Sequence, residues 1–276
     1  MSASSNERSE FIDATPARAL AALLDARVPD LDAPLPPLWH WLYLLERPAT
    51  AELGVDGHPA MGIPTPPAPG MRRMIAGGRI TQHAGLRVGS VASRTSRVVA
   101  ERSTVGRSGP LSFVTVRHDI EQSGRLALSE ELDIVYRAAG RADATAAANR
   151  SVVVPDPVAE PRTERFYDIG PAMLFRFSAL TYNAHRIHYD LQYVTEIERY
   201  PGLVVHGPLQ ALLMSELLRL QGNPAGVLHY QLRSPLFAGP GIRVLAGTSP
   251  DGDAAVVYDR DGSVTATAHR MPAATP

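Results

Sequence analysis

One segment near the end of the chain constrains the fold more than any other. Residues 208–221 place leucines at positions 209, 212, 213, 217 and 220, a spacing typical of a helix with one broad apolar face. Pro208 suits the first helical position, and Gly222-Asn-Pro224 suits the stop. Strands are predicted after it at 227–232, 242–248, 254–258 and 263–269. Such a helix must bury its apolar face, and the strands that follow offer a sheet to cover it.

The first half of the chain predicts the same order of elements. Residues 35–46 are apolar and begin with Pro36 and Pro37, so we predict a buried helix there. Residues 72–137 then predict strands, with a hairpin turn at Ser123-Gly124. The pattern of residues 79–89 resembles that of residues 228–239, which indicates an internal duplication. We also expect a short helix at 17–24, and no ordered structure in residues 1–15.

These elements predict an α+β protein made of two helix-on-sheet units. The hotdog architecture, in which a curved sheet wraps a central helix, satisfies the pattern twice and gives a double hotdog. We place the N-terminal unit at 16–140, a linker at 141–163 and the C-terminal unit at 164–276. An edge strand could form at Val152–Val154. Pairing the two units side by side would join their sheets and cover one exposed edge on each.

Composition excludes several classes of function. The chain has 27 basic and 28 acidic residues, which argues against a nucleic-acid surface or a basic membrane patch. It contains no lysine, hence no Schiff-base or P-loop lysine, and no cysteine, hence no disulfide, thiolate nucleophile or cysteine metal site. Because the N-terminus lacks an apolar signal segment and no run has the length of a membrane span, we expect a cytoplasmic protein.

Groups that can transfer protons gather just before the strong helix. Asn183, His185 and His188 fall within six residues, and His206-Gly207 follows where the helix begins. Apolar neighbours, among them Phe177 and Ile187, indicate a half-buried cluster, although histidines three apart are often only surface residues. A base beside a helix N-terminus can handle a proton and an oxyanion in one reaction.

This segment resembles the hydratase 2 motif of MaoC-like enoyl-CoA hydratases, Asp-x-Asn-Pro-x-His followed later by His-Gly. Asn183 stands at the Asp position, His185 at the Asn, Arg186 at the Pro and His188 at the His, so the spacing is kept while three identities differ. The form is similar to the branch that contains type 2 hydroxyacyl-thioester dehydratases and mesaconyl-C4-CoA and itaconyl-CoA hydratases. Segments 35–46, 56–59, 106–111 and 131–137 resemble that branch too.

The resemblance implies reversible addition of water to a 2-enoyl-CoA, with a short carboxylated acyl group of the mesaconyl or itaconyl type. His188 would be the base, and the Gly207 N–H would receive the charge that develops on the thioester oxygen. Asn183, being neutral, would hold the water through its carbonyl oxygen. No cofactor is implied beyond the coenzyme A of the substrate. The N-terminal half, which lacks an Asn-x-x-x-x-His loop of its own, would be a degenerate partner that supplies a pocket wall and sheet pairing, and the protein could form a homodimer.

Several residues keep more than one interpretation. His185 could steady its loop or contact substrate, and His206 could shape the turn before the helix or contact substrate. Arg186 and Arg107 could bind coenzyme A phosphates or a substrate carboxylate, or could be solvated or salt-bridged surface residues. Asp190 could orient His185 or cap a turn. Two tyrosines, at 182 and 189, are expected to pack rather than to act as acids.

Other functions remain alternatives to hydration of an acyl-CoA. The first is dehydration of a 3-hydroxyacyl-ACP in fatty-acid synthesis, and the second is a non-catalytic hotdog that binds acyl-CoA. A thioesterase is possible on the same fold, but no acidic nucleophile or base is placed for it. A metal site formed by His185 and His188 with Asp190 or Asp168 is the main rival for the cluster.

Overall fold

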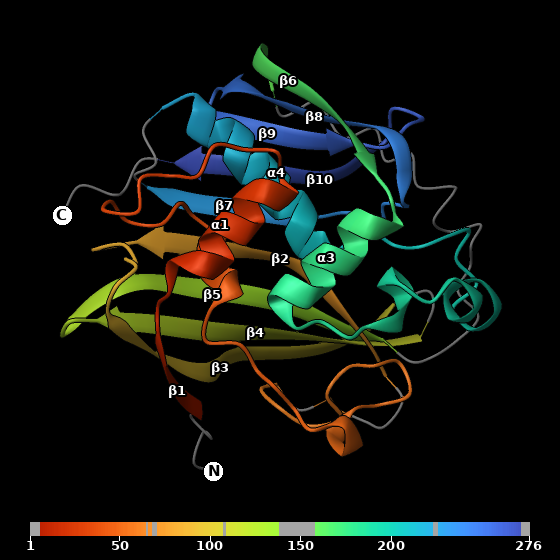
Figure 1. Cartoon of the computed structure of the whole chain (residues 1–276). Helices are drawn as coiled ribbons and strands as arrows, with labels where there is room; N and C mark the ends of the chain where they lie inside the picture. Colours follow the sequence, from red (N-terminus) through yellow and green to blue (C-terminus); the bar gives the residue numbers. More distant parts are fainter. Residues whose placement is uncertain are drawn as a thin grey trace.

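The computed structural model describes residues 6–64, 66–67, 71–106, 109–137, 158–222 and 226–271. Ten strands form one antiparallel sheet across both halves of the chain (Figure 1). The strands are β1 (Asn6–Phe11), β2 (Arg72–Gln82), β3 (Val91–Gly106), β4 (Gly109–Gln122), β5 (Arg125–Arg137), β6 (Glu160–Ile169), β7 (Val227–Leu232), β8 (Gly239–Ser249), β9 (Gly252–Tyr258) and β10 (Val264–Met271).

Among the described residues, helices α1, α3 and α4 lie on one face of this sheet (Figure 1). The helices and short turns are α1 (Ala14–Leu23), η1 (Trp39–Leu42), η2 (Thr50–Glu52), α3 (Pro171–Thr181), η3 (Arg186–His188), the π-helical turn η4 (Tyr193–Ile197) and α4 (Gly207–Leu220). Within the described ranges, none of these helices is both long and apolar enough to cross a membrane.

The strand order repeats between the two halves. It runs β1-β3-β4-β5-β2 in the first half and, counted from the opposite edge, β6-β8-β9-β10-β7 in the second. Each strand of the second order is the corresponding strand of the first with five added to its number. The duplication expected from the sequence is therefore present in the topology.

The two half-sheets join through β2 and β7. These strands pair antiparallel from Gly77 opposite Gln231 to Thr81 opposite Val227. A Cβ on Gly77 would lie 2.4 Å from the carbonyl oxygen of Tyr230, so only glycine allows the backbones to approach this closely. The expected continuity of the two sheets is confirmed at this junction.

The strong helix is present as predicted. Helix α4 begins at Gly207, and Leu209, Leu212 and Leu217 are fully buried while Leu220 is exposed. Burying an aliphatic side chain of this size contributes about 1.5–3 kcal/mol, so the stripe anchors α4 to the C-terminal strands. The predicted strands and the Ser123-Gly124 turn are confirmed too, both turn residues having positive φ.

The predicted helix at 35–46 is wrong. Only Trp39–Leu42 forms a single 3₁₀ turn, because Leu38 and Leu44 adopt left-handed backbone conformations with φ of 71° and 55°. The apolar character of the segment does reflect burial, since Trp39 is fully buried. The helix that the first half contributes is α1, close to the short helix expected at 17–24, and Asp13 caps it by accepting the Thr15 N–H at 2.7 Å.

The first strand of each half was not predicted. Strand β1 lies in residues 1–15, which were expected to lack structure, and β6 begins at Glu160 inside the expected linker. Both are the outermost strands of the sheet and carry the charged residues that exposed edges favour, which hides their strand pattern. Residues 141–157, with the Val152–Val154 segment, lie outside the described residues, and the unit boundaries remain a prediction.

Candidate active site

A cavity of about 930 Å³ is lined by residues from both halves of the chain. Asn183, His185, His188 and Gly207 all line it. The structure therefore brings together the imidazole and the helix-terminal glycine that the sequence suggested would act on one thioester. Segments 57–59 and 73–76 of the first half complete the wall beside them.

His188 is fixed in one tautomer by its backbone contact. Its Nδ1 lies 2.7 Å from the carbonyl oxygen of Val204, and because a carbonyl only accepts, Nδ1 carries the hydrogen. Nε2 is then left with its lone pair, as a base requires. Burial, followed by the charge of His185, lowers the pKa of His188 to about 3, so the ring is neutral at physiological pH.

The ring of His206 packs against the ring of His188. The two rings stack with centroids 3.6 Å apart and planes 19° apart. His206 is fully buried, its Nε2 lies 2.9 Å from Ser178 Oγ, and burial followed by the charge of His188 lowers its pKa well below the usual value. It does not line the cavity, unlike Gly207, the residue that follows it. This geometry favours support of the turn over the predicted contact with substrate.

Asn183 uses its carbonyl oxygen partly inside its own loop. Oδ1 accepts the backbone N–H of His185 at 3.0 Å, and the Asn183 N–H donates to the Ser178 carbonyl at 2.9 Å. A carbonyl oxygen has a second lone pair, and the side-chain amide has two further donors. The predicted role of holding a water therefore requires that second lone pair or the amide.

Gly207 occupies the first position of α4, where backbone N–H groups have no partner within the helix. A Cβ at this position would lie 2.3 Å from Cδ1 of Leu232. A side chain here would force Leu232 or the start of α4 to move, so the constraint on this position is space rather than an unusual backbone angle. Its N–H is at the positive end of the helix dipole, which favours a developing negative charge.

The structure adds a pair that sequence analysis did not assign, Asp56 and His58. His58 lines the cavity and stacks on His185 with centroids 3.9 Å apart, and Asp56 Oδ2 lies 3.3 Å from His58 Nδ1. Burial would raise the pKa of Asp56, but the hydrogen bond and charge of His58 outweigh it and hold this pKa at about 2. The ionised carboxylate of Asp56 therefore contacts His58, a histidine that lines the cavity.

The turn that carries this pair is pressed against the Asn183–His188 loop. A Cβ on Gly57 would lie 1.9 Å from the carbonyl oxygen of Ala184, and the Arg186 N–H donates to the carbonyl of Asp56 at 2.8 Å. The only sequence signal was Asp56-Gly-His-Pro59, which resembled the family without an assigned role. The cavity wall that the first half was expected to supply therefore includes a histidine that contacts the Asn183–His188 loop.

His185 lies between the two groups. Its ring centroid is 3.9 Å from that of His58 and 5.4 Å from that of His188, the second pair being perpendicular. Burial, followed by the charge of His58, lowers its pKa to about 2. Its backbone steadies the loop through Asn183 while its ring lines the cavity, so both interpretations offered by the sequence are compatible with the geometry.

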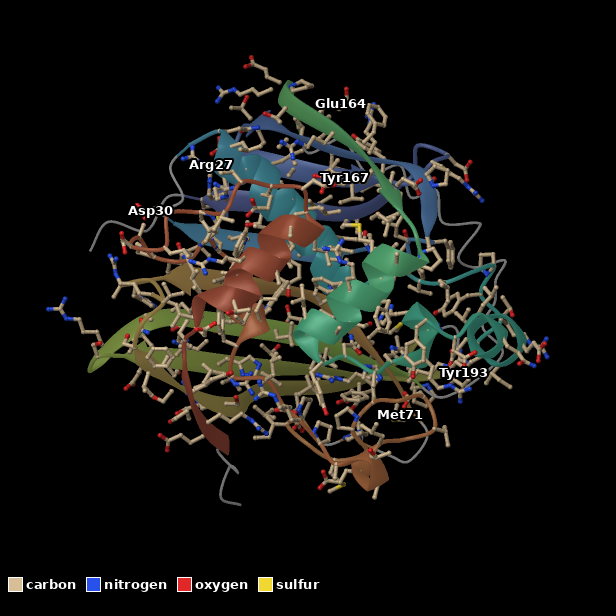
Figure 2. The ribbon with its side chains drawn as sticks, viewed as in Figure 1. Arg27, Asp30, Met71, Glu164, Tyr167 and Tyr193 are labelled. Atoms are coloured by element: carbon tan, nitrogen blue, oxygen red, sulfur yellow. The ribbon has the colours of Figure 1, made fainter. Side chains whose placement is uncertain are left out.

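Arg186 is held away from the cavity lining. Its guanidinium is 2.6 Å from Asp190 Oδ2 and 3.1 Å from the Val55 carbonyl oxygen. Its Cζ also lies 4.1 Å from the ring centroid of Tyr193, a residue that Figure 2 labels in the segment after α3. Asp190 also accepts the Tyr193 N–H at 2.9 Å, which is the capping alternative. The geometry therefore favours a salt-bridged Arg186 over a substrate contact.

Two other groups of sequence predictions remain. Arg107 lies outside the described residues. Tyr182 and Tyr189, which were expected to pack rather than to act as acids, are each about half exposed and line the cavity, so their role stays a prediction.

The metal site considered from sequence, His185 and His188 with Asp190 or Asp168, does not bring its ligand atoms together among the described residues, and Asp190 binds Arg186 instead. A different trio, Asp56, His58 and His185, places possible ligand atoms within 4.8 Å of one another. Oxygen and imidazole nitrogen would suit a borderline divalent metal such as zinc. However, the two imidazoles are tilted by only 36° and lie nearly face to face. Since the lone pairs of an imidazole lie in the plane of its ring, two rings that lie nearly face to face do not direct their lone pairs at one point, and the arrangement does not favour convergent ligation.

Comparison with solved structures places this arrangement in a known architecture. HtdX of Mycobacterium tuberculosis superposes with a TM-score of 0.67 at 15% identity, over 96% of this chain and 98% of that one. A second Mycobacterium tuberculosis protein, described as having a double hotdog fold, gives a TM-score of 0.56 at 15% identity over 97% and 94% of the two chains. The protein is thus a double hotdog whose cavity holds a buried neutral histidine and a helix N-terminus.

Sequence comparison identifies the family within that architecture. Residues 38–238 match the family of hydroxyacyl-thioester dehydratases type 2, and the chain belongs to this family of MaoC-like hydratases and dehydratases. The mesaconyl-C(4)-CoA hydratase of Chloroflexus aurantiacus is 47% identical over 238 residues, which cover 85% of this chain and 82% of the relative. The resemblance, the fold class and the assignment as a hydro-lyase are confirmed.

Proposed function

We propose that this protein adds water reversibly across the double bond of a short 2-enoyl-CoA, with an acyl group of the mesaconyl-C4 type. The similarity to a mesaconyl-C(4)-CoA hydratase supports the acyl group. The observation that carries the chemistry is the neutral His188, whose Nδ1–H is committed to Val204, in the cavity that Gly207 also lines.

The reaction needs one base and one oxyanion donor. Nε2 of His188 takes a proton from water while the water oxygen bonds to the β carbon of the thioester. The electrons of the double bond move toward the thioester oxygen, where the Gly207 N–H receives the charge. One well-placed donor of this kind is worth about 3 kcal/mol of barrier. The enolate then takes the proton back from His188 at the α carbon, so one water is added and no other reactant is consumed.

Asp56 compensates in part for the neutral Asn183. His188 becomes an imidazolium during the reaction, and a buried imidazolium needs a negative charge nearby. The ionised carboxylate of Asp56 contacts His58, the His58 ring packs on His185, and the His185 ring lies edge-on to His188. We therefore assign Asp56 as a positioning residue that stabilises the histidine chain, while His188 carries the proton.

A spectrophotometric hydration assay tests this function. It compares crotonyl-CoA, mesaconyl-C4-CoA and itaconyl-CoA with wild-type protein and with His188→Ala, after thermal unfolding has shown that the variant is folded. We expect turnover by the wild type and a loss of about 10²–10⁴-fold in the variant. Near-normal turnover by His188→Ala would eliminate the mechanism. Binding of all three thioesters without turnover would indicate a non-catalytic acyl-CoA-binding protein, and turnover of crotonyl-ACP alone would indicate the dehydratase of fatty-acid synthesis.

A further inference from the structure

The cavity lining contains more arginines than acidic residues. Four arginines and two glutamates line it: Arg73, Arg94, Arg137, Arg233, Glu46 and Glu130. A lining with more cations than anions raises the local concentration of negatively charged ligands. The question is which of the arginines is free to bind one.

Three of the four arginines have polar partners. Arg94 is 3.5 Å from Glu46, Arg137 donates to the Tyr200 hydroxyl at 3.3 Å, and Arg233 donates to the side chain of Gln231 at 3.1 Å. These contacts orient the guanidinium groups within the protein. They leave Arg73 as the remaining candidate.

Arg73 has no hydrogen bond or ion pair with any residue in the described part of the chain, and its Nε is buried without a partner. Glu130 forms no ion pair with it, and the two carboxylate oxygens of Glu130 are bound by His40 at 3.1 Å and by the Trp41 indole N–H at 2.7 Å. A buried donor left unsatisfied costs about 1–3 kcal/mol, and more when it is charged. A bound carboxylate would remove that cost, since a guanidinium fork matches its two oxygens.

The position of Arg73 suits binding of the free carboxylate of the acyl group. Arg73 pairs with Tyr136 across β2 and β5, on the sheet face that carries Glu130 and His118. Arg73 lines the same cavity as His185 and His188, and its charge adds to the burial that mainly lowers the pKa of His185. In a mesaconyl-C4 group the free carboxylate is bonded to the β carbon, which is the carbon that water attacks. A cation that binds this carboxylate must therefore stand close to the catalytic histidines.

The neighbouring wall argues against a long alkyl chain. Arg94, His118 and Glu130 line the cavity together with Arg73. Covering such charged and polar groups with hydrocarbon removes their solvation without replacing it. A short acyl group with its own carboxylate suits these surroundings better.

We propose that Arg73 forms a subsite for the carboxylate of the acyl group and thereby selects 2-enoyl thioesters that carry a carboxylate on the β carbon. This inference rests on the proposed hydratase function and names its substrate class. The carboxylate docks on the Arg73 guanidinium while the β carbon faces His188. Coenzyme A phosphates are the competing use of a cavity arginine, and the test separates the two.

The experiment compares two thioesters that differ at the subsite. Mesaconyl-C4-CoA carries a methyl group and a carboxylate on the β carbon, whereas crotonyl-CoA carries a methyl group and a hydrogen; the coenzyme A part is identical. Hydration is measured with wild type, Arg73→Gln, Arg73→Met and the control Arg79→Gln. Arg79 lies on the same strand and forms an exposed ion pair with Glu131 outside the cavity lining.

We expect Arg73→Gln and Arg73→Met to lower kcat/KM for mesaconyl-C4-CoA by about a hundredfold. Their kcat/KM for crotonyl-CoA should stay within about threefold of the wild-type value. Arg79→Gln should leave kcat/KM for both thioesters unchanged. An equal loss on both thioesters overturns the subsite, because Arg73 would then serve the coenzyme A part or the fold. No loss on either thioester overturns it too. A wild type that hydrates crotonyl-CoA but not mesaconyl-C4-CoA refutes the subsite and leaves a hydratase, whereas a wild type that hydrates no thioester refutes the proposed function itself.

Discussion

The imidazole rings of His188 and His206 are stacked, with centroids 3.6 Å apart and planes within 19° of parallel. His188 belongs to the loop after α3, and His206 is the residue that caps the start of α4. The stack therefore links the proposed base to the helix whose first N–H is the proposed oxyanion donor. A displacement of either ring would move both groups of the site.

Replacing His206 tests whether the stack positions the base. We expect His206→Ala to lower kcat about tenfold with little change in KM, because His188 loses one wall of its pocket. His206→Phe keeps a flat ring in the stack and should recover most of this loss, although Ser178 loses its partner. Steady-state kinetics of the two folded variants measure the difference. Equal activity of His206→Ala and wild type would show that the Val204 contact alone holds His188.

Asp56 is expected to act through His58 rather than on the substrate. Asp56→Asn removes the charge that stabilises the histidine chain while keeping the shape of the side chain, so kcat should fall about tenfold and KM should change little. His58→Gln should give a loss of the same size. If the two losses multiply in the double variant, the residues act independently, and the chain described here is refuted.

Much of the fold follows from the sequence. The leucine spacing of 208–221 identified α4, and the branched residues of 227–269 identified four strands, because both signals arise from burial on one face. The segment 35–46 has the same apolar character but folds as a single turn, since Leu38 and Leu44 leave the helical region. Apolar composition reports burial, and it does not report the backbone angles of a segment held by long-range contacts such as Trp39 to Glu216 at 2.8 Å.

The candidate site was predictable only within one segment. Asn183, His188 and Gly207 were selected because they lie close together in the sequence and line the same cavity. His58 and Arg73 were not selected, because their proximity to the site arises from packing of the first half against the second. Arg186 was selected because it lies inside the motif, yet its guanidinium binds Asp190. Proximity in sequence does not reveal which way a side chain points.

Stability should fall as the pH is lowered from about 7 to 5. Burial is the main cause that lowers the pKa of His185 to about 2, of His188 to about 3 and of His118 to about 4. The unfolded chain protonates its histidines near pH 6.5, so below that pH it binds more protons than the native state and the free energy of unfolding decreases. Chemical denaturation at several pH values measures this. His118→Gln should weaken the pH dependence, and a constant or rising free energy of unfolding between pH 7 and 5 would contradict the assignment.

Asn183→Asp should change the pH dependence of the reaction. The Asp side chain can still accept the His185 N–H, which Asn183 Oδ1 accepts at 3.0 Å, so the loop should persist. An added carboxylate favours the imidazolium and raises the pKa of His188. The acid limb of kcat/KM should therefore move to higher pH than in the wild type, where the pKa of His188 is about 3. Rates measured from pH 4 to 8 with crotonyl-CoA give the answer, and an unchanged profile would mean that residue 183 does not face the base.

Gly207→Ala should lower activity about tenfold or more, because its Cβ would lie 2.3 Å from Cδ1 of Leu232 and either the leucine or the start of α4 must shift. A displaced α4 would carry the N–H away from the thioester oxygen, and oxyanion donors lose their effect steeply with geometry.

Leu232→Ala in the Gly207→Ala background makes room for the added methyl group. Recovery of kcat in that double variant, with Leu232→Ala alone as the control, would assign the loss to the clash. If activity stays low although both variants are stably folded, the Cβ itself blocks the approach of the thioester carbonyl to the amide. Wild-type kcat in Gly207→Ala would refute both explanations and remove Gly207 from the proposed oxyanion site.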